Sequence, residues 1–128
     1  MSNRRKIGIL GEKLSQDYLR EKGYIIKECN YRKKCGEIDI IATDKKGILT
    51  FFEIKTRTNN KFGTPSEAVT TTKQLKILKT VDFYLKENPV FLNCEYHIDV
   101  ISVYLNYRTR LASLIHLKNA IFELDFED

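Results

Sequence analysis

The chain has 128 residues, of which 42% are hydrophobic and 30% charged, and its formal net charge is +5. This length and composition exclude a disordered chain and match one ordinary domain spanning residues 1–128. No apolar run approaches the roughly 20 residues of a membrane helix, and Ile7 to Leu10 is too short for the core of a signal peptide, so we expect a soluble cytoplasmic protein without a membrane partner.

The first predicted element is a helix over residues 7–22, which Gly23 would end. Its apolar positions recur at helical spacing. They are Ile7, Leu10, Leu14 and Tyr18. A second face holds the small residues Gly8, Gly11 and Ser15. Small side chains would let another backbone come close to this face of the helix.

Three predicted strands follow, over residues 24–31, 36–43 and 48–57. The last two are apolar on both sides, so we expect helices on both faces of the sheet. Charged residues alternate within these two strands. They are Glu37, Asp39, Glu53 and Lys55. Because residues two apart share a face, the members of each pair project together from backbone that looks buried.

The loop between these strands sets which charges face each other. A three-residue loop over 45–47, with Gly47 left-handed, would place Asp39 opposite Glu53 and Glu37 opposite Lys55. A two-residue loop would instead pair Asp39 with Phe52 and turn the carboxylates to opposite sides. With the first loop, the Cβ atoms of Asp39 and Glu53 would lie roughly 4.5 to 5.5 Å apart, close enough to share a divalent cation.

The second half of the chain begins with a predicted helix. Thr64, Pro65 and Glu67 form a capping pattern, and Thr71 with Gln74 repeats its spacing, so the helix begins near residue 64 or restarts near 71. Its predicted core face is Leu75, Leu78, Val81 and Leu85, and it should end before Pro89. A strand is expected over residues 96–105, and residues 118–128 form an acidic, loosely packed tail.

The cysteines are odd in number and have no C-x-x-C spacing, which argues against a disulfide framework and a zinc site. Cys29, Cys35 and Cys94 are therefore expected to be reduced thiols. His97 and Asp99 share a strand face and are a weaker candidate for binding metal or phosphate. A lone strand histidine is more often structural.

Two carboxylates and a lysine at one end of a sheet suit phosphodiester hydrolysis. Asp39 and Glu53 would hold Mg²⁺ or Mn²⁺, which oxygen ligands favour, and Lys55 would orient water or neutralise developing charge. The alternative is a cross-strand ionic ladder without catalytic duty. Three acids face one lysine here, so without a cation the like charges would repel, which favours the site.

Basic residues gather near these strands and suggest a phosphate-rich partner. The candidates for contact with nucleic acid are Arg32, Lys33, Lys34, Arg57, Lys61, Lys73 and Lys76. Other basic clusters are Arg4 to Lys6 and Lys45 with Lys46. Solubility alone is the alternative explanation for such a surface.

Several motifs in order resemble the YraN-type family of small bacterial proteins. They are Gly11-Glu12, Asn30-Tyr31-Arg32, Gly36 to Ala42, Phe52 to Arg57, Phe62-Gly63 and Glu67-Ala68-Val69. The resemblance implies an α/β, restriction-endonuclease-like fold with a central mixed β-sheet flanked by helices. It maps the PD-(D/E)xK signature to Asp39 and to Glu53 with Lys55. Similarity to Holliday junction resolvases further implies Glu12 as an additional metal ligand and a homodimer.

The predicted function is therefore a metal-dependent endonuclease that acts on DNA, with branched or flap DNA as candidate substrates. Its predicted catalytic residues are Asp39, Glu53 and Lys55, with Mg²⁺ or Mn²⁺ held by Glu12, Asp39 and Glu53. The alternative is a nucleic-acid-binding or adaptor domain that keeps the nuclease fold without turnover.

Overall fold

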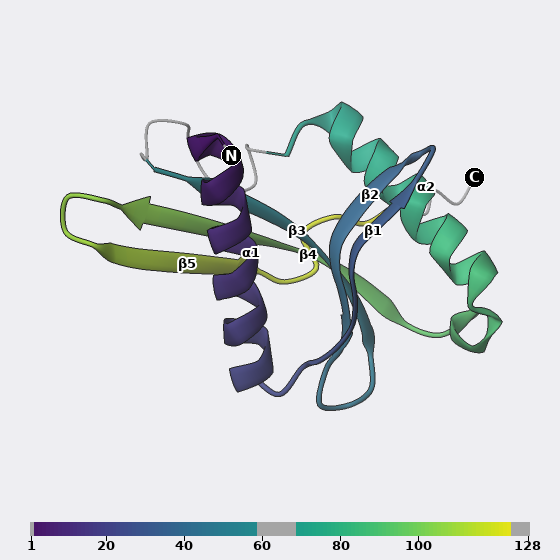
Figure 1. Cartoon of the computed structure of the whole chain (residues 1–128). Coiled ribbons are helices and arrows are strands. Elements are labelled where there is room, and N and C mark those ends of the chain that lie inside the picture. Colours follow the sequence, from purple (N-terminus) through teal and green to yellow (C-terminus); the bar gives the residue numbers. More distant parts are fainter. Residues whose placement is uncertain (1, 59–68, 124–128) are drawn as a thin grey trace.

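A computed structural model describes residues 2–58 and 69–123 of the chain (Figure 1). The elements are α1 (Asn3–Glu21), β1 (Ile25–Lys33), β2 (Gly36–Thr43), β3 (Leu49–Arg57), α2 (Thr71–Glu87), the short 3₁₀ helix η2 (Pro89–Phe91), β4 (Tyr96–Asn106) and β5 (Leu111–Leu117). The sheet order is β1-β2-β3-β4-β5, in which β3 and β4 are parallel and the other neighbours antiparallel. A crossover through α2 makes the parallel pair possible.

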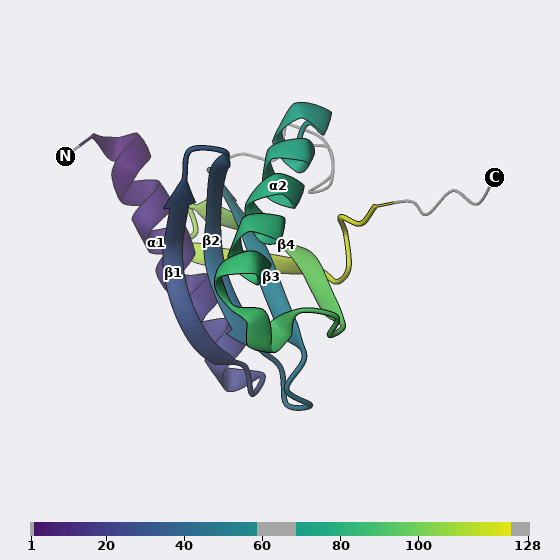
Figure 2. The ribbon, with the colours of Figure 1, turned by 90° about the vertical axis from the view of Figure 1, so that its right-hand side faces the viewer.

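One helix covers each face of the sheet (Figure 2). The core on the α1 side includes Leu19 and Phe52, and the core on the α2 side includes Phe51 and Val81. Adjacent residues of β3 therefore enter different cores, which explains why this strand is apolar on both sides. The predicted α/β fold, a central mixed sheet flanked by helices, is confirmed.

Helix α1 comes close to the sheet at one small residue. A Cβ atom on Gly11 would lie 1.7 Å from Oγ1 of Thr56 on β3, so only glycine allows this approach. The expectation of a small, close-packed face is confirmed at Gly11 and the buried Ser15. It is wrong at Gly8, where an added Cβ would meet nothing within 4 Å.

Helix α2 faces the core with most of the stripe that its leucine spacing predicts, because Val81 is buried and Leu78 and Leu85 are half-buried against the core. Leu75 is 55% exposed, whereas the buried residues of α2 are Ile77, Thr80, Val81 and Tyr84. The ring of Tyr84 meets Tyr31 and Phe51 edge-on at centroid distances of 5.3 and 5.5 Å. The predicted core face is therefore confirmed at Leu78, Val81 and Leu85 and wrong at Leu75, and the edge-on rings add Tyr84 to the core.

The ends of α2 follow local capping rules. Its N-cap is Thr70, whose hydroxyl accepts from the Lys73 N–H at 3.2 Å, so the predicted restart near Thr71 is confirmed. The earlier start near Thr64 and Pro65 lies outside the described residues. The helix ends before Pro89, as predicted. Its placement carries Lys73 in the first turn toward β3.

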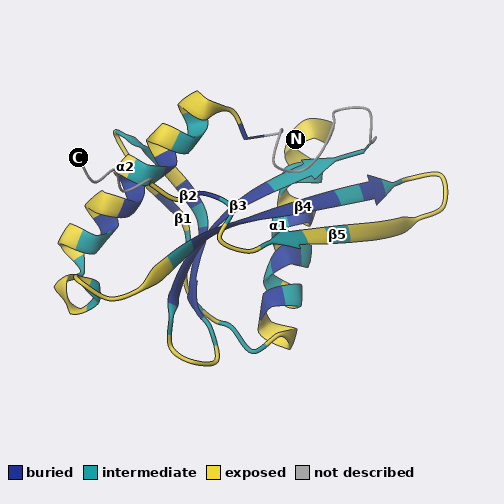
Figure 3. Ribbon diagram, turned by 180° about the vertical axis from the view of Figure 1, so that it is seen from behind, coloured by how far each residue is buried: buried dark blue, intermediate teal, exposed yellow. Residues whose placement is uncertain are grey.

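The predicted strands are all present, with ends shifted by at most two residues. Strand β5, which the sequence does not clearly predict, adds to the edge beyond β4. Burial concentrates in β3 and β4, while the outward side of β5 is exposed (Figure 3). After β5, the Ala120 N–H donates to Ile98 O at 2.9 Å and Ile121 packs into the core.

Two further features bear on the sequence predictions. Cys29, Cys35 and Cys94 are all free thiols, in agreement with the expected absence of a disulfide framework. Within residues 2–58 and 69–123, neither helix has the length and apolar character needed to cross a membrane.

Candidate active site

The β2–β3 hairpin has the register that the three-residue loop predicts. The Asp44 N–H donates to Ile48 O at 3.0 Å, and Gly47 has the left-handed φ of 82°. Paired residues run from Thr43–Leu49 to Ile40–Phe52. The predicted loop is therefore confirmed, and the next facing positions along this register are Asp39 and Glu53.

The ladder between the two strands ends at Ile40 and Phe52, and the next residue of β2, Asp39, reaches the backbone of β3 with its side chain. Its Oδ2 accepts the Ile54 backbone N–H at 2.7 Å, a bond that a strand partner would otherwise satisfy. The ladder ends before it reaches the expected Glu37–Lys55 pair. Glu37 instead binds Arg32 of β1 at 2.8 Å, so it is held by the opposite neighbouring strand.

Glu53 is a buried carboxylate with two lysines against one oxygen. It is 3% exposed, and its Oε1 lies 2.6 Å from Nζ of Lys73 and 3.7 Å from Nζ of Lys55. Lys55 is the predicted neighbour two residues along β3. The sequence does not indicate the contact with Lys73, because only the packing of α2 on the sheet brings that residue to Glu53.

Burial and crowding of like charges distort the titration of this site. Burial and the nearby Glu53 carboxylate raise the pKa of Asp39 to about 7, although the Ile54 N–H opposes the shift. Burial and the Lys73 ammonium lower the pKa of Lys55. Burial and the Glu37 carboxylate raise the pKa of Glu12, against the effect of Arg32. Perturbed groups that gather in this way are typical of functional sites.

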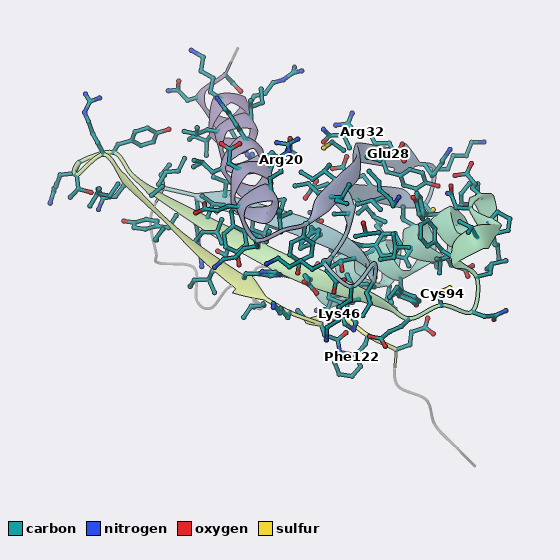
Figure 4. All side chains as sticks on the ribbon, turned by 90° about the horizontal axis from the view of Figure 1, so that it is seen from below. Arg20, Glu28, Arg32, Lys46, Cys94 and Phe122 are labelled. Atoms are coloured by element: carbon teal, nitrogen blue, oxygen red, sulfur yellow. The ribbon has the colours of Figure 1, made fainter. Side chains whose placement is uncertain are left out.

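The site opens into a groove of about 730 Å³ between the first half of α1 and the ends of β2 and β3. Its charged lining consists of Glu12, Glu37, Asp39, Lys55 and the arginines Arg4, Arg5, Arg32 and Arg57. Arg32 projects from the edge strand β1, far from Lys46 in the β2–β3 loop (Figure 4). Because the lining runs from Arg4 on α1 to Arg57 on β3, the groove brings together acids and arginines from distant parts of the sequence.

The predicted nucleic-acid contacts separate into two groups in space. Arg32 and Arg57 line the groove, whereas Lys73 and Lys76 line a smaller pocket of about 280 Å³ beside Glu37. Lys33 binds Glu87 of α2 at 3.3 Å. Lys34 is exposed, and Lys61 lies outside the described residues. Arg4 and Arg5 are groove residues that the sequence marks as basic but does not place near the acids.

The carboxylates do not form a ready-made metal cluster. Within residues 2–58 and 69–123, no three His, Cys, Asp or Glu side chains are gathered closely enough to hold an ion. The carboxylates of Glu53 and Glu12 nevertheless both act to raise the pKa of Asp39, after the larger effect of burial. Oxygen donors that repel one another suit a hard divalent cation, so this donor set fits magnesium or manganese.

A second polar cluster lies away from the groove, and Asp99 is its only member that the sequence marked as a polar candidate. Asp99, 2% exposed, binds His116 Nε2 at 2.7 Å, and Tyr18 of α1 lies 2.9 Å from His116 Nδ1. Asp99 also accepts the Asn119 N–H at 2.8 Å. His97 instead pairs with Glu95 at 2.9 Å, so His97 and Asp99 have different partners. The cluster fastens α1 to β4 and β5.

Comparisons with known proteins agree over most of the chain. Residues 11–103 match the model of "Uncharacterised protein family UPF0102". A UPF0102 protein of Clostridium botulinum strain Loch Maree is 46% identical over 114 residues, which cover 89% of this chain and 92% of that protein. One from Caldicellulosiruptor saccharolyticus is 39% identical and covers 92% of this chain and 98% of its own length.

Among solved structures, the chain is similar to Pyrococcus furiosus SfsA, whose structure was determined in complex with Ca²⁺. The TM-score is 0.41 at 14% identity, and the match covers 94% of this chain but 65% of that one.

Proposed function

This chain belongs to the UPF0102 family, the YraN-type family that its motifs indicate, and from the geometry of its groove we propose that it is a metal-dependent endonuclease acting on DNA. One observation carries the proposal. Asp39 and Lys55 line an open groove together with four arginines, and the buried Glu53 carboxylate lies against Lys55 at 3.7 Å. Acids, a lysine and a cationic lining in one groove suit hydrolysis of a polyanion.

Asp39 and Glu53 would hold the divalent cation, with Glu12 as a further ligand from α1. Mg²⁺ or Mn²⁺ bound there would polarise the phosphate and lower the pKa of a bound water. The proposal also explains why a protein keeps buried carboxylates that repel each other, because a cation relieves that repulsion. It accounts for the raised pKa of Asp39 as a property of the metal-free protein.

The other side chains of the groove would bind and orient the DNA. Lys55 lines the groove beside the acids, where its ammonium would neutralise charge that develops on a phosphate. Arg4, Arg5, Arg32 and Arg57 would contact neighbouring phosphates and fix the position of the strand. Branched or flap DNA is the proposed substrate class, and a homodimer would supply the two active centres that cleavage of both strands needs. We place this activity in the cytoplasm.

The test is cleavage of labelled single-stranded, duplex, flap and four-way-junction DNA with Mg²⁺ or Mn²⁺. Asp39→Asn preserves the size and the acceptor for the Ile54 N–H but removes the charge, so it should cut at least 100-fold more slowly than wild type. Asp17→Asn is the matched control, because Asp17 is an exposed carboxylate on α1 outside the groove. Equal cleavage by wild type and Asp39→Asn would contradict the proposal.

A second candidate function is a nucleic-acid-binding domain without turnover. The contact that favours it is the one between Lys73 and Glu53 at 2.6 Å, which occupies an oxygen that a metal would need. This alternative predicts salt-dependent DNA binding that is the same with EDTA and with Mg²⁺. It also predicts that no DNA in the panel is cut.

A further inference from the structure

The two lysines that contact Glu53 come from different elements. Lys55 belongs to the same strand as Glu53, but Lys73 comes from the first turn of α2, on the sheet face that α2 covers. Nζ of Lys73 is also the closer of the two, at 2.6 Å against 3.7 Å for Lys55. Lys73, not Lys55, is therefore the principal counter-ion of the buried carboxylate.

The position of Lys73 is fixed by the backbone around it. The Thr70 hydroxyl caps α2 by accepting the Lys73 N–H at 3.2 Å, and Gln74 donates from its side chain to Val69 O at 2.9 Å. The Lys73 side chain itself is 37% exposed, whereas the Glu53 side chain is 3% exposed. The carboxylate is thus buried, while its counter-ion reaches it from the margin of the smaller pocket and remains partly exposed to solvent.

We propose that Lys73 is a displaceable counter-ion that neutralises Glu53 in the metal-free protein and yields this carboxylate to a divalent cation. The inference rests on the proposed function, because it takes Glu53 to be a metal ligand. A lone buried carboxylate is costly, so the metal-free protein needs a cation at this point. Lysine is suited to the exchange, since its single ammonium on a flexible stem makes no bidentate fork.

Displacement has two consequences for the site. Metal binding must compete with an existing ion pair, so Lys73 lowers the apparent metal affinity. The released Lys73 ammonium, which already carries its charge, would lose its partner carboxylate beside Glu37 and Lys76, which border the same pocket. Metal binding would in this way alter the surface at the start of α2 as well as the groove.

The experiment measures Mn²⁺ binding by titration calorimetry and by loss of the free-ion electron paramagnetic resonance signal. Lys73→Met removes the ammonium and keeps a flexible apolar stem, and it should bind Mn²⁺ at least fivefold more tightly than wild type. Its metal-free form should melt at a lower temperature, and saturating Mn²⁺ should remove most of that difference. Lys79→Met, an exposed lysine of the same helix, is the matched control and should behave as wild type.

The outcomes separate this inference from the proposed function. If wild type and Lys73→Met bind Mn²⁺ equally, or the variant binds more weakly, Lys73 is not a competitor and the inference is overturned while the metal site stands. If neither binds Mn²⁺, both proposals fail. Binding by Lys73→Met alone would support the inference most directly.

A measurement on the unaltered protein covers the case in which Lys73→Met does not fold. An ammonium in a short ion pair exchanges its protons with water more slowly than a free one, so at low temperature Lys73 should give a ¹⁵N signal without metal. Mg²⁺ should broaden or remove that signal. A signal that persists unchanged at saturating Mg²⁺ would overturn the inference.

Discussion

The Asp39 carboxylate takes the place of a strand partner for Ile54, accepting its backbone N–H at 2.7 Å where the ladder between β2 and β3 ends. The Asp39 side chain thus has both a structural role and an electrostatic role. Asp39 accepts a backbone N–H of β3. Its carboxylate also lies near that of Glu53, and this neighbour helps to raise the pKa of Asp39. An amide can do the first task but not the second.

Replacing Asp39 by asparagine should therefore stabilise the metal-free protein at high pH. Burial and Glu53 raise the pKa of Asp39 from 3.8 to about 7, so its favourable contribution to folding is full below pH 4 and is lost as the pH rises through 7. In EDTA at pH 8, the free energy of unfolding of Asp39→Asn should be about 1–2 kcal/mol higher than that of wild type. The expected difference is smaller than the full pKa shift would give, because Asp39 is only half-buried. Urea denaturation at pH 5 and pH 8 measures the difference. A gain that is equal at both pH values would contradict the assignment.

Divalent cations should reverse that order. Mg²⁺ at 100 times its dissociation constant would stabilise wild type by about 2.7 kcal/mol, while Asp39→Asn, which lacks a ligand charge, should gain much less. Thermal melts with Mg²⁺ and after its removal by EDTA make the comparison. A matching rise in melting temperature for both proteins would show that the ion binds elsewhere.

Close packing of α1 on β3 should make Gly11 intolerant of any side chain. A Cβ there would lie 1.7 Å from Thr56 Oγ1, so Gly11→Ala should destabilise the fold by about 1–3 kcal/mol and push Glu12 away from the groove. Gly8→Ala is the control from the same helix, because its Cβ meets nothing within 4 Å. It should gain up to about 1 kcal/mol from helix propensity. Denaturation midpoints that shift in the same direction would refute this account.

The buried cluster that fastens α1 to β5 should depend on a single hydroxyl. Tyr18→Phe leaves His116 Nδ1 without its partner at 2.9 Å, and the His116 side chain is 5% exposed. A loss of about 1–2 kcal/mol is expected from the unsatisfied group. Tyr107→Phe, at a residue 61% exposed, should change stability little. Calorimetric unfolding of the two variants decides the point, and equal melting temperatures would count against a stabilising role.

If DNA binds in the groove as proposed, the salt dependence of its affinity should change only in variants of groove residues. Arg5 lines the groove, whereas Arg20 lies near the other end of α1. Loss of one phosphate contact in Arg5→Ala should weaken binding and reduce the slope of log K against log salt by about 1. Arg20→Ala should leave the slope unchanged. Anisotropy titrations at several salt concentrations test this. Equal slopes for the two variants would indicate that DNA binds a surface other than the groove.

Local chemistry explains which parts of this structure could be predicted from the sequence. The left-handed Gly47 and the alternating residues of β2 and β3 determine the hairpin register, so the proximity of the Asp39 and Glu53 charges was predictable although the ladder ends at Ile40 and Phe52. The end of α2 before Pro89 and its start near Thr71 follow from similarly local signals. Each depends on residues within a few positions of one another.

Contacts set by packing could not be predicted in the same way. The leucine spacing of α2 places Leu75 in the core, whereas the structure leaves Leu75 exposed and buries Tyr84 against the rings of Tyr31 and Phe51. The docking of α2 on the sheet also brings Lys73 to Glu53, so the principal counter-ion of the site could not be predicted from local sequence. The pairing of Tyr18 with His116 likewise needs α1 and β5 to be placed first.

The parallel pairing of β3 with β4 through α2 has a consequence for the order in which the site is assembled during synthesis. The β2–β3 hairpin is local and precedes α2 in the chain, so Asp39, Glu53 and Lys55 leave the ribosome before Lys73. The hairpin can bring the acids together as soon as it emerges, since hairpins close in roughly 1–10 μs. During that interval Lys55 is the neighbouring cation on β3, and Glu53 gains its closer contact with Lys73 only when the crossover helix docks.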